Sequence, residues 1–126
     1  MPAYDSQAFR PPAPVATVDV LAAANGDILS GVAMLVDSGA DVSLLPRAEV
    51  AKLIDIAQTT DQYELEGFDG SRSMAPAARL EIRFLGKSFR GQFLLVDTPY
   101  GALGRNILNS LSIVLDGPTL TWTERH

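Results

Sequence analysis

The sequence predicts an all-β fold, mainly antiparallel, with one or two short helices, and three observations support this. Apolar and polar residues alternate in several short segments, as they do in strands with one buried face. Turn-forming pairs separate these segments, namely Asn25-Gly26, Asp69-Gly70 and Gly86-Lys87. Helical spacing of apolar residues extends over one longer segment, 47–57.

Length and composition fit one compact domain. With 126 residues, 47% of them hydrophobic, the chain has enough apolar material for one core and no room for a second full domain. Residues 1–14 are rich in proline, which fixes backbone angles and removes amide donors. We therefore expect an extended N-terminal arm over 1–14, followed by a single domain over 15–126.

Charge and residue types exclude several classes of function. A net charge of −5 without a basic tract disfavours a nucleic-acid or anionic-membrane surface. No signal-peptide pattern and no run of about 18 apolar residues is found, which predicts a cytoplasmic protein without a membrane span. Cysteine is absent and the only histidine is the terminal His126, which argues against disulfides, thiolate metal sites and a Ser-His-Asp triad. Carboxylates remain as the main catalytic groups, and we expect neither a metal nor another cofactor.

The first part of the chain is predicted to form a hairpin and a helix. Alternation over 17–22 and the turn pair that follows it predict two antiparallel strands. The second strand includes the nearly all-apolar run 31–36, which is typical of a strand covered on both faces, and it leads into Asp37. Pro46 suits the start of a helix expected over 47–57.

The second part of the chain is predicted to be mostly strand. A polar-tipped hairpin is expected over 63–74, and alternation predicts a half-buried antiparallel pair over 79–84 and 89–96. The remaining elements are expected to be a loop over 97–101, one or two helical turns within 106–111, and strands over 112–115 and 119–123.

Three segments point to a catalytic carboxylate. Residues 35–41 read Leu-Val-Asp-Ser-Gly-Ala-Asp, an apolar strand that delivers Asp37 into a tight turn. Residues 67–70 read Gly-Phe-Asp-Gly, and residues 102–108 read Ala-Leu-Gly-Arg-Asn-Ile-Leu. In this order the segments resemble the retropepsin-like aspartic proteases, the retroviral protease family, and the resemblance covers most of the chain.

The resemblance implies a fold and a reaction. The fold is the retropepsin-like closed or folded β-barrel lobe of the acid proteases. The reaction is peptide-bond hydrolysis by a water molecule activated between two carboxylates. Since the chain has one such motif, the second Asp37 would come from the other chain of a homodimer that acts on a peptide or protein substrate. The hairpin around 66–71 would be a flap that closes over an extended peptide.

The resemblance also implies roles for individual residues. The catalytic residues would be Asp37, Ser38 and Gly39. The substrate-binding residues would be Ala40, Asp41, Val42, Gly67, Phe68, Asp69, Gly70 and Leu103, and Leu44 is a further candidate for a pocket wall. Structural support would come from Gly104, Arg105 and Asn106. Arg105 is expected to form a bidentate ion pair with Asp41.

Other interpretations stay open at this point. One is a catalytically silent peptide-binding or dimerisation module in which Asp37 is an ordinary turn residue. Another is a regulatory protease limited to self-processing or to one partner. A phosphate loop over 101–105 is disfavoured because the Gly-Lys-Ser/Thr ending of such loops is missing.

Overall fold

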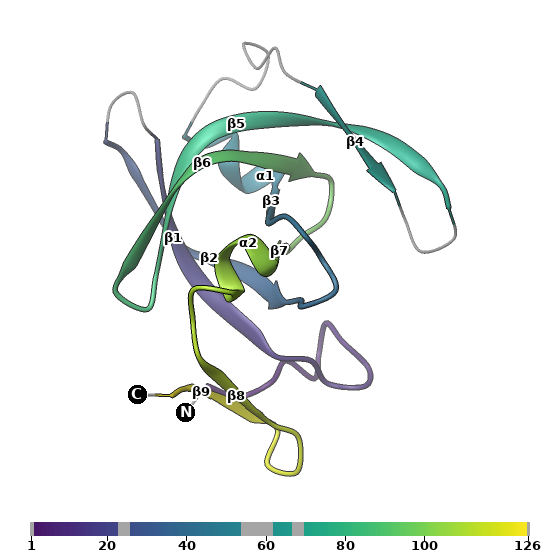
Figure 1. The fold of residues 1–126 in the computed structure, drawn as a ribbon, viewed down its shortest axis with the longest axis vertical. Coiled ribbons are helices and arrows are strands. Elements are labelled where there is room, and N and C mark those ends of the chain that lie inside the picture. The colour runs from purple at the N-terminus through teal and green to yellow at the C-terminus, as the bar shows by residue number, and fades with distance from the viewer. Residues whose placement is uncertain (1, 23–25, 54–61, 67–69, 126) are drawn as a thin grey trace.

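The structure, a computed structural model, describes residues 2–22, 26–53, 62–66 and 70–125, and it consists mostly of strands (Figure 1). The strands are β1 (Val15–Ala22), β2 (Ile28–Val36), β3 (Leu44–Pro46), β4 (Gln62–Glu66), β5 (Arg72–Phe84), β6 (Lys87–Val96), β7 (Gly101–Leu103), β8 (Ile113–Asp116) and β9 (Thr121–Glu124). The helices are α1 (Arg47–Val50) and α2 (Arg105–Leu108). The predicted all-β class is confirmed.

No helix within the described ranges has the length and apolar character that a membrane crossing requires.

The strands of the main sheet close into a barrel. Their order is β1-β2-β7-β3-β6-β5, and β5 pairs with β1 to complete the ring. Most neighbours are antiparallel, but β2–β7 and β3–β6 are parallel. The first residues of β5 extend beyond the ring and pair with β4 as a hairpin (Figure 1). Closure leaves few unpaired strand edges, and the closed lobe is the one predicted.

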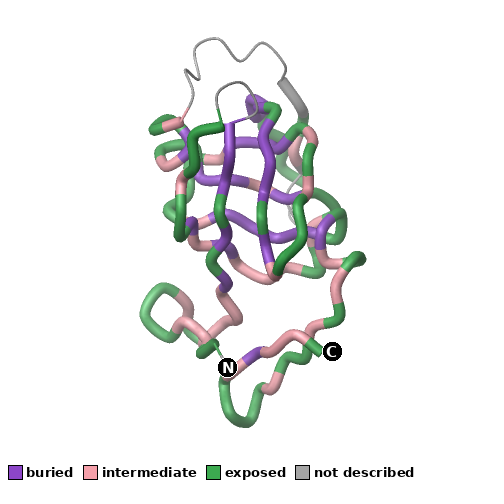
Figure 2. Tube along the Cα trace, turned by 90° about the vertical axis from the view of Figure 1, so that its left-hand side faces the viewer, coloured by how far each residue is buried: buried purple, intermediate pink, exposed green. Residues whose placement is uncertain are grey.

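The barrel interior is filled by apolar side chains that alternate with exposed ones. In β1, Ala16, Val18 and Val20 are buried, whereas Thr17 and Asp19 are exposed. In β5 and β6 the buried residues form longer runs interrupted by exposed ones, and Figure 2 shows such buried stretches along the barrel. The fully buried core residues include Met34, Leu45, Leu80, Ile82, Leu103 and Ile107. Because truncating such residues typically costs about 2–5 kcal/mol, this shared core holds β2, β7 and α2 firmly together.

β2 is less covered than its sequence predicts. Val32 and Met34 are buried, but Ala33 and Leu35 on the opposite face are only half-buried. The reason is geometric, since a strand in a barrel wall has one face toward the interior and the other face outside.

Two further elements differ in extent from the prediction. The helix predicted over 47–57 ends at Val50 and continues as a turn over 51–53, while 54–57 lie outside the described residues. Gly101, predicted in a loop, is the first residue of β7 because its backbone pairs with β2. β5 differs as well, because it joins the second strand of the hairpin predicted over 63–74 to the strand predicted over 79–84, and β3 was not predicted. The other predicted strands and the short helix that begins at Arg105 are found close to their expected positions.

Glu81 is more buried than alternation along β5 predicts. It is 8% exposed, and its carboxylate lies between two arginines. Arg90 Nε donates to Oε1 and Arg83 Nε donates to Oε2, both at 2.7 Å. These hydrogen bonds, that of Arg90 first, hold the pKa of Glu81 below its ordinary value of 4.5. Because Glu81 and Arg90 are cross-strand partners, the contact also joins β5 to β6.

We expect Glu81→Gln to lower the thermal unfolding midpoint at pH 7 and to change it little at pH 3. The pKa of Glu81 is lower in the folded chain, so the ionised carboxylate stabilises the fold above its ordinary pKa of 4.5, and this contribution disappears as the pH falls through the folded-state pKa. Circular dichroism melts of both proteins at both pH values check this. Glu49→Gln, which removes an exposed ion pair with Lys52, is the matched control and should have little effect at either pH. An equal effect of Glu81→Gln at both pH values would contradict the prediction.

The two ends of the chain form a small second sheet. β8 and β9 make a hairpin, and residues 2–4 bond to the other edge of β9. Tyr4 N donates to Leu120 O at 2.8 Å, and Trp122 N donates to Pro2 O at 3.0 Å. Both termini therefore lie at the same end of the molecule (Figure 1). The Trp122 indole attaches this sheet to the barrel by donating from Nε1 to the first carbonyl of β1 at 3.1 Å.

The proline-rich arm bends back on itself instead of staying extended. Asp5 N donates to Ala13 O at 2.8 Å, and Ala13 N donates to Asp5 O at 3.1 Å. These bonds close the residues between them into a loop, which we call the Asp5–Ala13 loop. The prolines still prevent a regular helix or central strand there, which agrees with the sequence.

Candidate active site

Asp37 follows β2 directly, where the backbone is held from both sides. β2 and β7 are paired up to Val36 and Leu103, and Asp37 N continues this ladder by donating to Leu103 O at 3.0 Å. On the other side, Val36 N donates to Pro14 O at 2.9 Å. Asp37 itself is half-buried, so its carboxylate is positioned by a fixed backbone and still has access to solvent.

The turn after β2 fixes one oxygen of this carboxylate. Asp37 Oδ1 accepts a hydrogen bond from Gly39 N at 3.0 Å, and Asp37 O accepts one from Ala40 N at 3.2 Å. Aspartate side chains commonly bond the backbone two residues ahead and thereby stabilise a turn. Ser38 and Gly39 are exposed in the single chain, so the turn presents its outer surface to solvent.

Arg105, the first residue of α2, bonds to this turn twice. Its backbone N donates to Ala40 O and its Nη1 donates to Ser38 O, both at 2.8 Å. The expected ion pair between Arg105 and Asp41 is not formed within the described part of the chain, where Asp41 is exposed. The guanidinium instead bonds a peptide carbonyl of the turn. Arg105 thus bonds to the turn, but through an acceptor other than the predicted Asp41 carboxylate.

A buried serine joins the two motif segments. Ser43 is 1% exposed, and its Oγ donates to Asn106 Oδ1 at 2.8 Å and accepts from Gly104 N at 3.0 Å. Buried hydroxyl and amide groups are stable when they are hydrogen-bonded, so this network holds α2 against the segment that follows the turn. Ser43 was not among the predicted site residues, although it is a lone polar residue between Val42 and Leu44, which indicates a hydrogen-bonded role.

The structure places the two predicted segments next to each other. The first comprises Asp37, Ser38, Gly39, Ala40, Asp41 and Val42, and the second comprises Leu103, Gly104, Arg105 and Asn106. Of the predicted flap tip, Gly67, Phe68 and Asp69 lie outside the described residues. Gly70 is exposed and has a φ of +82°, a conformation that favours glycine. In Figure 1 the described end of the β4–β5 hairpin lies on the same side as the loop after β2.

A small cavity opens beside Asp37. Its volume is about 210 Å³, and it is lined by Leu35, Asp37, Leu44, Val96, Thr98, Tyr100, Gly101 and Ala102. Leucine, valine and alanine residues supply much of this lining, and Asp37 is the one acidic residue in it. The cavity therefore suits an apolar side chain that is bound next to the carboxylate.

The cavity only partly matches the predicted pocket walls. Leu44 lines it, whereas Leu103 is fully buried in the core and does not. Thr98 and Tyr100 line it although the loop over 97–101 was expected only to connect two elements. The loop directly precedes the Gly-Arg-Asn motif, and this position could have predicted that Thr98 and Tyr100 lie near the site.

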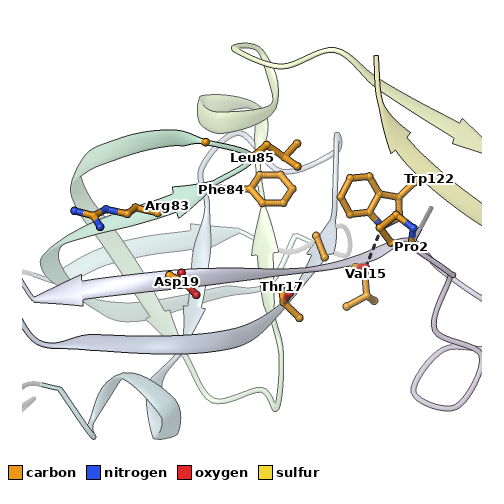
Figure 3. A pocket seen from close by; sticks show the side chains of 10 residues that line it. Pro2, Val15, Thr17, Asp19, Arg83, Phe84, Leu85 and Trp122 are labelled. Carbon is orange, nitrogen blue, oxygen red and sulfur yellow. Dashed lines mark hydrogen bonds between the residues drawn. The ribbon is translucent and has the colours of Figure 1, made fainter. Parts of the chain in front are cut away.

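A second cavity lies elsewhere in the barrel. It has a volume of about 590 Å³ and is lined by residues from β1, the end of β5 and the turn after it, and the small second sheet, among them Thr17, Phe84 and Trp122 (Figure 3). It contains none of the predicted site residues. Among the described residues, no group of three or more histidine, cysteine, aspartate or glutamate side chains is arranged to hold a metal ion.

The closed barrel, with a carboxylate-bearing turn backed by a short helix, defines a lobe of the acid-protease class. Residues 12–116 match the family described as retroviral aspartyl protease, and the chain belongs to that family. The fold is similar to that of EIAV protease in complex with the inhibitor HBY-793, with a TM-score of 0.54 and 24% sequence identity. This match covers 78% of the present chain and 86% of the viral one. The predicted retropepsin-like family is confirmed.

Proposed function

We propose that the protein is a homodimeric aspartic endopeptidase that hydrolyses peptide bonds with a water molecule held between two Asp37 carboxylates. The observation that supports this most directly is the Asp37 turn, which is bonded to β7 and α2 and lies beside an apolar cavity. Membership of the retroviral aspartyl protease family supports the same reaction. One chain supplies one Asp37, so the second carboxylate comes from a second copy of the chain.

The reaction needs one carboxylate as a base and one carboxyl group as an acid. The ionised Asp37 takes a proton from water, whose oxygen attacks the carbonyl carbon of the scissile peptide bond. The protonated Asp37 of the other chain donates its proton to the carbonyl oxygen. The C–N bond of the tetrahedral diol then breaks as one diol hydroxyl gives its proton to the Asp37 carboxylate that donated to the carbonyl oxygen and the C=O bond forms again. The first Asp37 passes the proton it took from water to the leaving nitrogen, so the pair again holds a single proton. The hydrogen bond from Gly39 N to Oδ1 orients the carboxylate for these steps.

The substrate is expected to lie extended between the Asp37 turn and the β4–β5 hairpin. An extended peptide bonds to backbone groups as an added strand, and closure of the hairpin around 66–71 would exclude water. The residues proposed to bind it are Ala40, Asp41, Val42, Gly67, Phe68, Asp69 and Gly70. The cavity beside Asp37 would accept an apolar side chain adjacent to the scissile bond.

The β8–β9 hairpin offers a surface for the second copy. Within the described residues, β9 lies between β8 and residues 2–4, and no strand pairs with the outer edge of β8. Val114 and Leu115 in β8 are 45% and 53% exposed, and Leu120 at the turn is 42% exposed. Apolar residues on an open strand edge favour pairing with another chain. We therefore place part of the dimer interface on this hairpin.

We expect the cleavage rate of dilute wild-type protein to rise faster than linearly with protein concentration. We expect Leu115→Arg to need at least about tenfold more protein to reach the same fraction of dimer. The added charge would have to be buried in the interface. Ile28→Arg is the matched control, because Ile28 is 55% exposed on β2 and lies away from the hairpin. Digestion of a peptide library at mildly acidic pH, read by mass spectrometry, gives the rate, and sedimentation velocity gives the oligomeric state.

Each outcome of this experiment has a clear meaning. A linear dependence and an active monomer would contradict the dimer. A dimer that cleaves no peptide would favour a silent binding module. Cleavage confined to the protein's own N-terminal arm would favour a regulatory protease that processes itself.

A further inference from the structure

The Asp5–Ala13 loop contacts the cavity beside Asp37 from outside. Phe9, in this loop, packs against Tyr100 with ring centroids 4.6 Å apart and ring planes inclined by 59°. Tyr100 lines the cavity, whereas Phe9 does not. Both side chains are half-buried. Phe9 therefore packs against one wall of the cavity that Asp37 also lines.

Hydrogen bonds inside the Asp5–Ala13 loop restrict the position of Phe9. Besides the backbone bonds that close it, Asp5 Oδ1 accepts hydrogen bonds from Gln7 N at 2.8 Å and Ala8 N at 2.9 Å. These bonds fix the segment that immediately precedes Phe9. A loop that is closed at its ends and bonded inside loses little further freedom when its ring packs against a neighbour.

The loop is also tied to the strand that carries the carboxylate. Pro14, the residue after the loop, accepts a hydrogen bond from Val36 N at 2.9 Å. Val36 is the last residue of β2 and directly precedes Asp37. The loop and the carboxylate thus share one backbone anchor, which fixes the position of the Phe9 ring relative to Asp37.

We propose that Phe9 is a positioning residue that holds the Tyr100 ring as the outer wall of this cavity and thereby sets the size of the apolar side chain accepted next to the scissile bond. The inference rests on the proposed endopeptidase function. At about 210 Å³ the cavity is smaller than pockets that enclose a whole small ligand, about 300–1,000 Å³, and suits a single side chain of about leucine's size. Tilted aromatic pairs are favourable, so loss of Phe9 frees the Tyr100 ring to turn away and enlarges the cavity.

The test compares peptides that differ only in one residue next to the scissile bond, leucine or tryptophan. We expect Phe9→Ala to raise the kcat/KM ratio of the tryptophan peptide to the leucine peptide by about tenfold, similar to the effect of a methylene group in an apolar pocket. Phe9→Tyr keeps the ring and should keep the wild-type ratio. Gln7→Ala is the matched control in the same loop, because Gln7 is exposed and its backbone bond to Asp5 is retained.

A double variant tests whether Phe9 acts through Tyr100. Tyr100→Ala should change the ratio by itself, and adding Phe9→Ala should change it no further, since the two residues form one unit. Fully additive changes would overturn the inference. Thermal unfolding shows whether Phe9→Ala remains folded, and Phe9→Leu takes its place if it does not.

Binding measurements distinguish failure of this inference from failure of the proposed function. Reduced-amide forms of the same peptides, which cannot be hydrolysed, are titrated while the ring resonances of Tyr100 are followed by NMR. Suppose that the wild type cleaves, and that Phe9→Ala has the wild-type preference for leucine over tryptophan both in cleavage and in binding. The inference is then overturned and the proposed function stands. If the wild type cleaves nothing, the proposed function fails. The inference then holds only if the leucine peptide shifts the Tyr100 resonances and Phe9→Ala alters the binding preference.

Discussion

Asp37→Asn is expected to reduce peptide-bond hydrolysis by about 10⁴-fold, at the upper end of what general acid–base catalysis contributes. An asparagine amide cannot take a proton from water, and a homodimer loses both carboxylates in a single substitution. The fold should be unaffected, because the asparagine oxygen still accepts the hydrogen bond that Gly39 N gives to Asp37 Oδ1 at 3.0 Å. Asp37→Asn is therefore expected to lose cleavage activity while it keeps the wild-type fold and stability.

Parallel digestion of a proteome-derived peptide library by wild type and Asp37→Asn measures this effect through the new chain termini. Asp19→Asn, at an exposed position of β1, is the matched control and should cleave as the wild type does. Equal unfolding midpoints would show that all three proteins are folded. Undiminished cleavage by Asp37→Asn would exclude Asp37 as the catalytic carboxylate, and cleavage by none of the proteins would favour the binding module.

Gly104→Ala is expected to destabilise the fold by about 3 kcal/mol, as a methyl group forced into a packed site does. A Cβ atom at Gly104 would be pressed against the carbonyl oxygens of Val42 and Ala40. These are backbone atoms, which cannot rotate away as a flexible side chain would. Any displacement also weakens the hydrogen bond from Gly104 N to Ser43 Oγ, so the turn and α2 would separate.

Gly91→Ala is the matched control for this substitution. Gly91 has open space around its missing Cβ and does not need a positive φ, so its replacement should change stability by no more than about 0.5 kcal/mol. Equilibrium unfolding in urea measures both effects, and peptide cleavage should fall in Gly104→Ala together with stability. If the two variants were equally stable, close packing of α2 against the turn would not be what holds the site.

The strands and the pairing of the two motif segments were predictable because their signals are local or belong to the family. Alternation in β1 reports directly on burial, and the turn pairs mark where strands reverse. The Asp-Ser-Gly and Gly-Arg-Asn motifs resemble those of the family, and this resemblance predicted that Arg105 lies close to the Asp37 turn. No property of either segment alone would have predicted that contact.

Several unpredicted details depend on a partner in another element. Glu81 is covered because Arg90 on the neighbouring strand lies directly across from it, which alternation along β5 alone does not encode. Arg105 has a carboxylate and a peptide carbonyl as competing acceptors, and only the three-dimensional path of the turn selects Ser38 O. Tyr100 becomes a wall residue because β7 pairs with β2 beside Asp37.

The parallel pairing of β2 with β7 also sets when the site can form during protein synthesis. Arg105 and the Ser38 carbonyl that it bonds are 67 residues apart in the chain, and the two partners of Ser43 are 63 and 61 residues from it. Contacts between such distant residues form late in folding because the long intervening loop must first be closed. A nascent chain that has exposed Asp37 but not yet α2 has the local hydrogen bonds of the turn but lacks those from Arg105. The contacts that join the Asp37 turn to α2 can thus form only after β7 and α2 have left the ribosome, so a growing chain lacks the completed site.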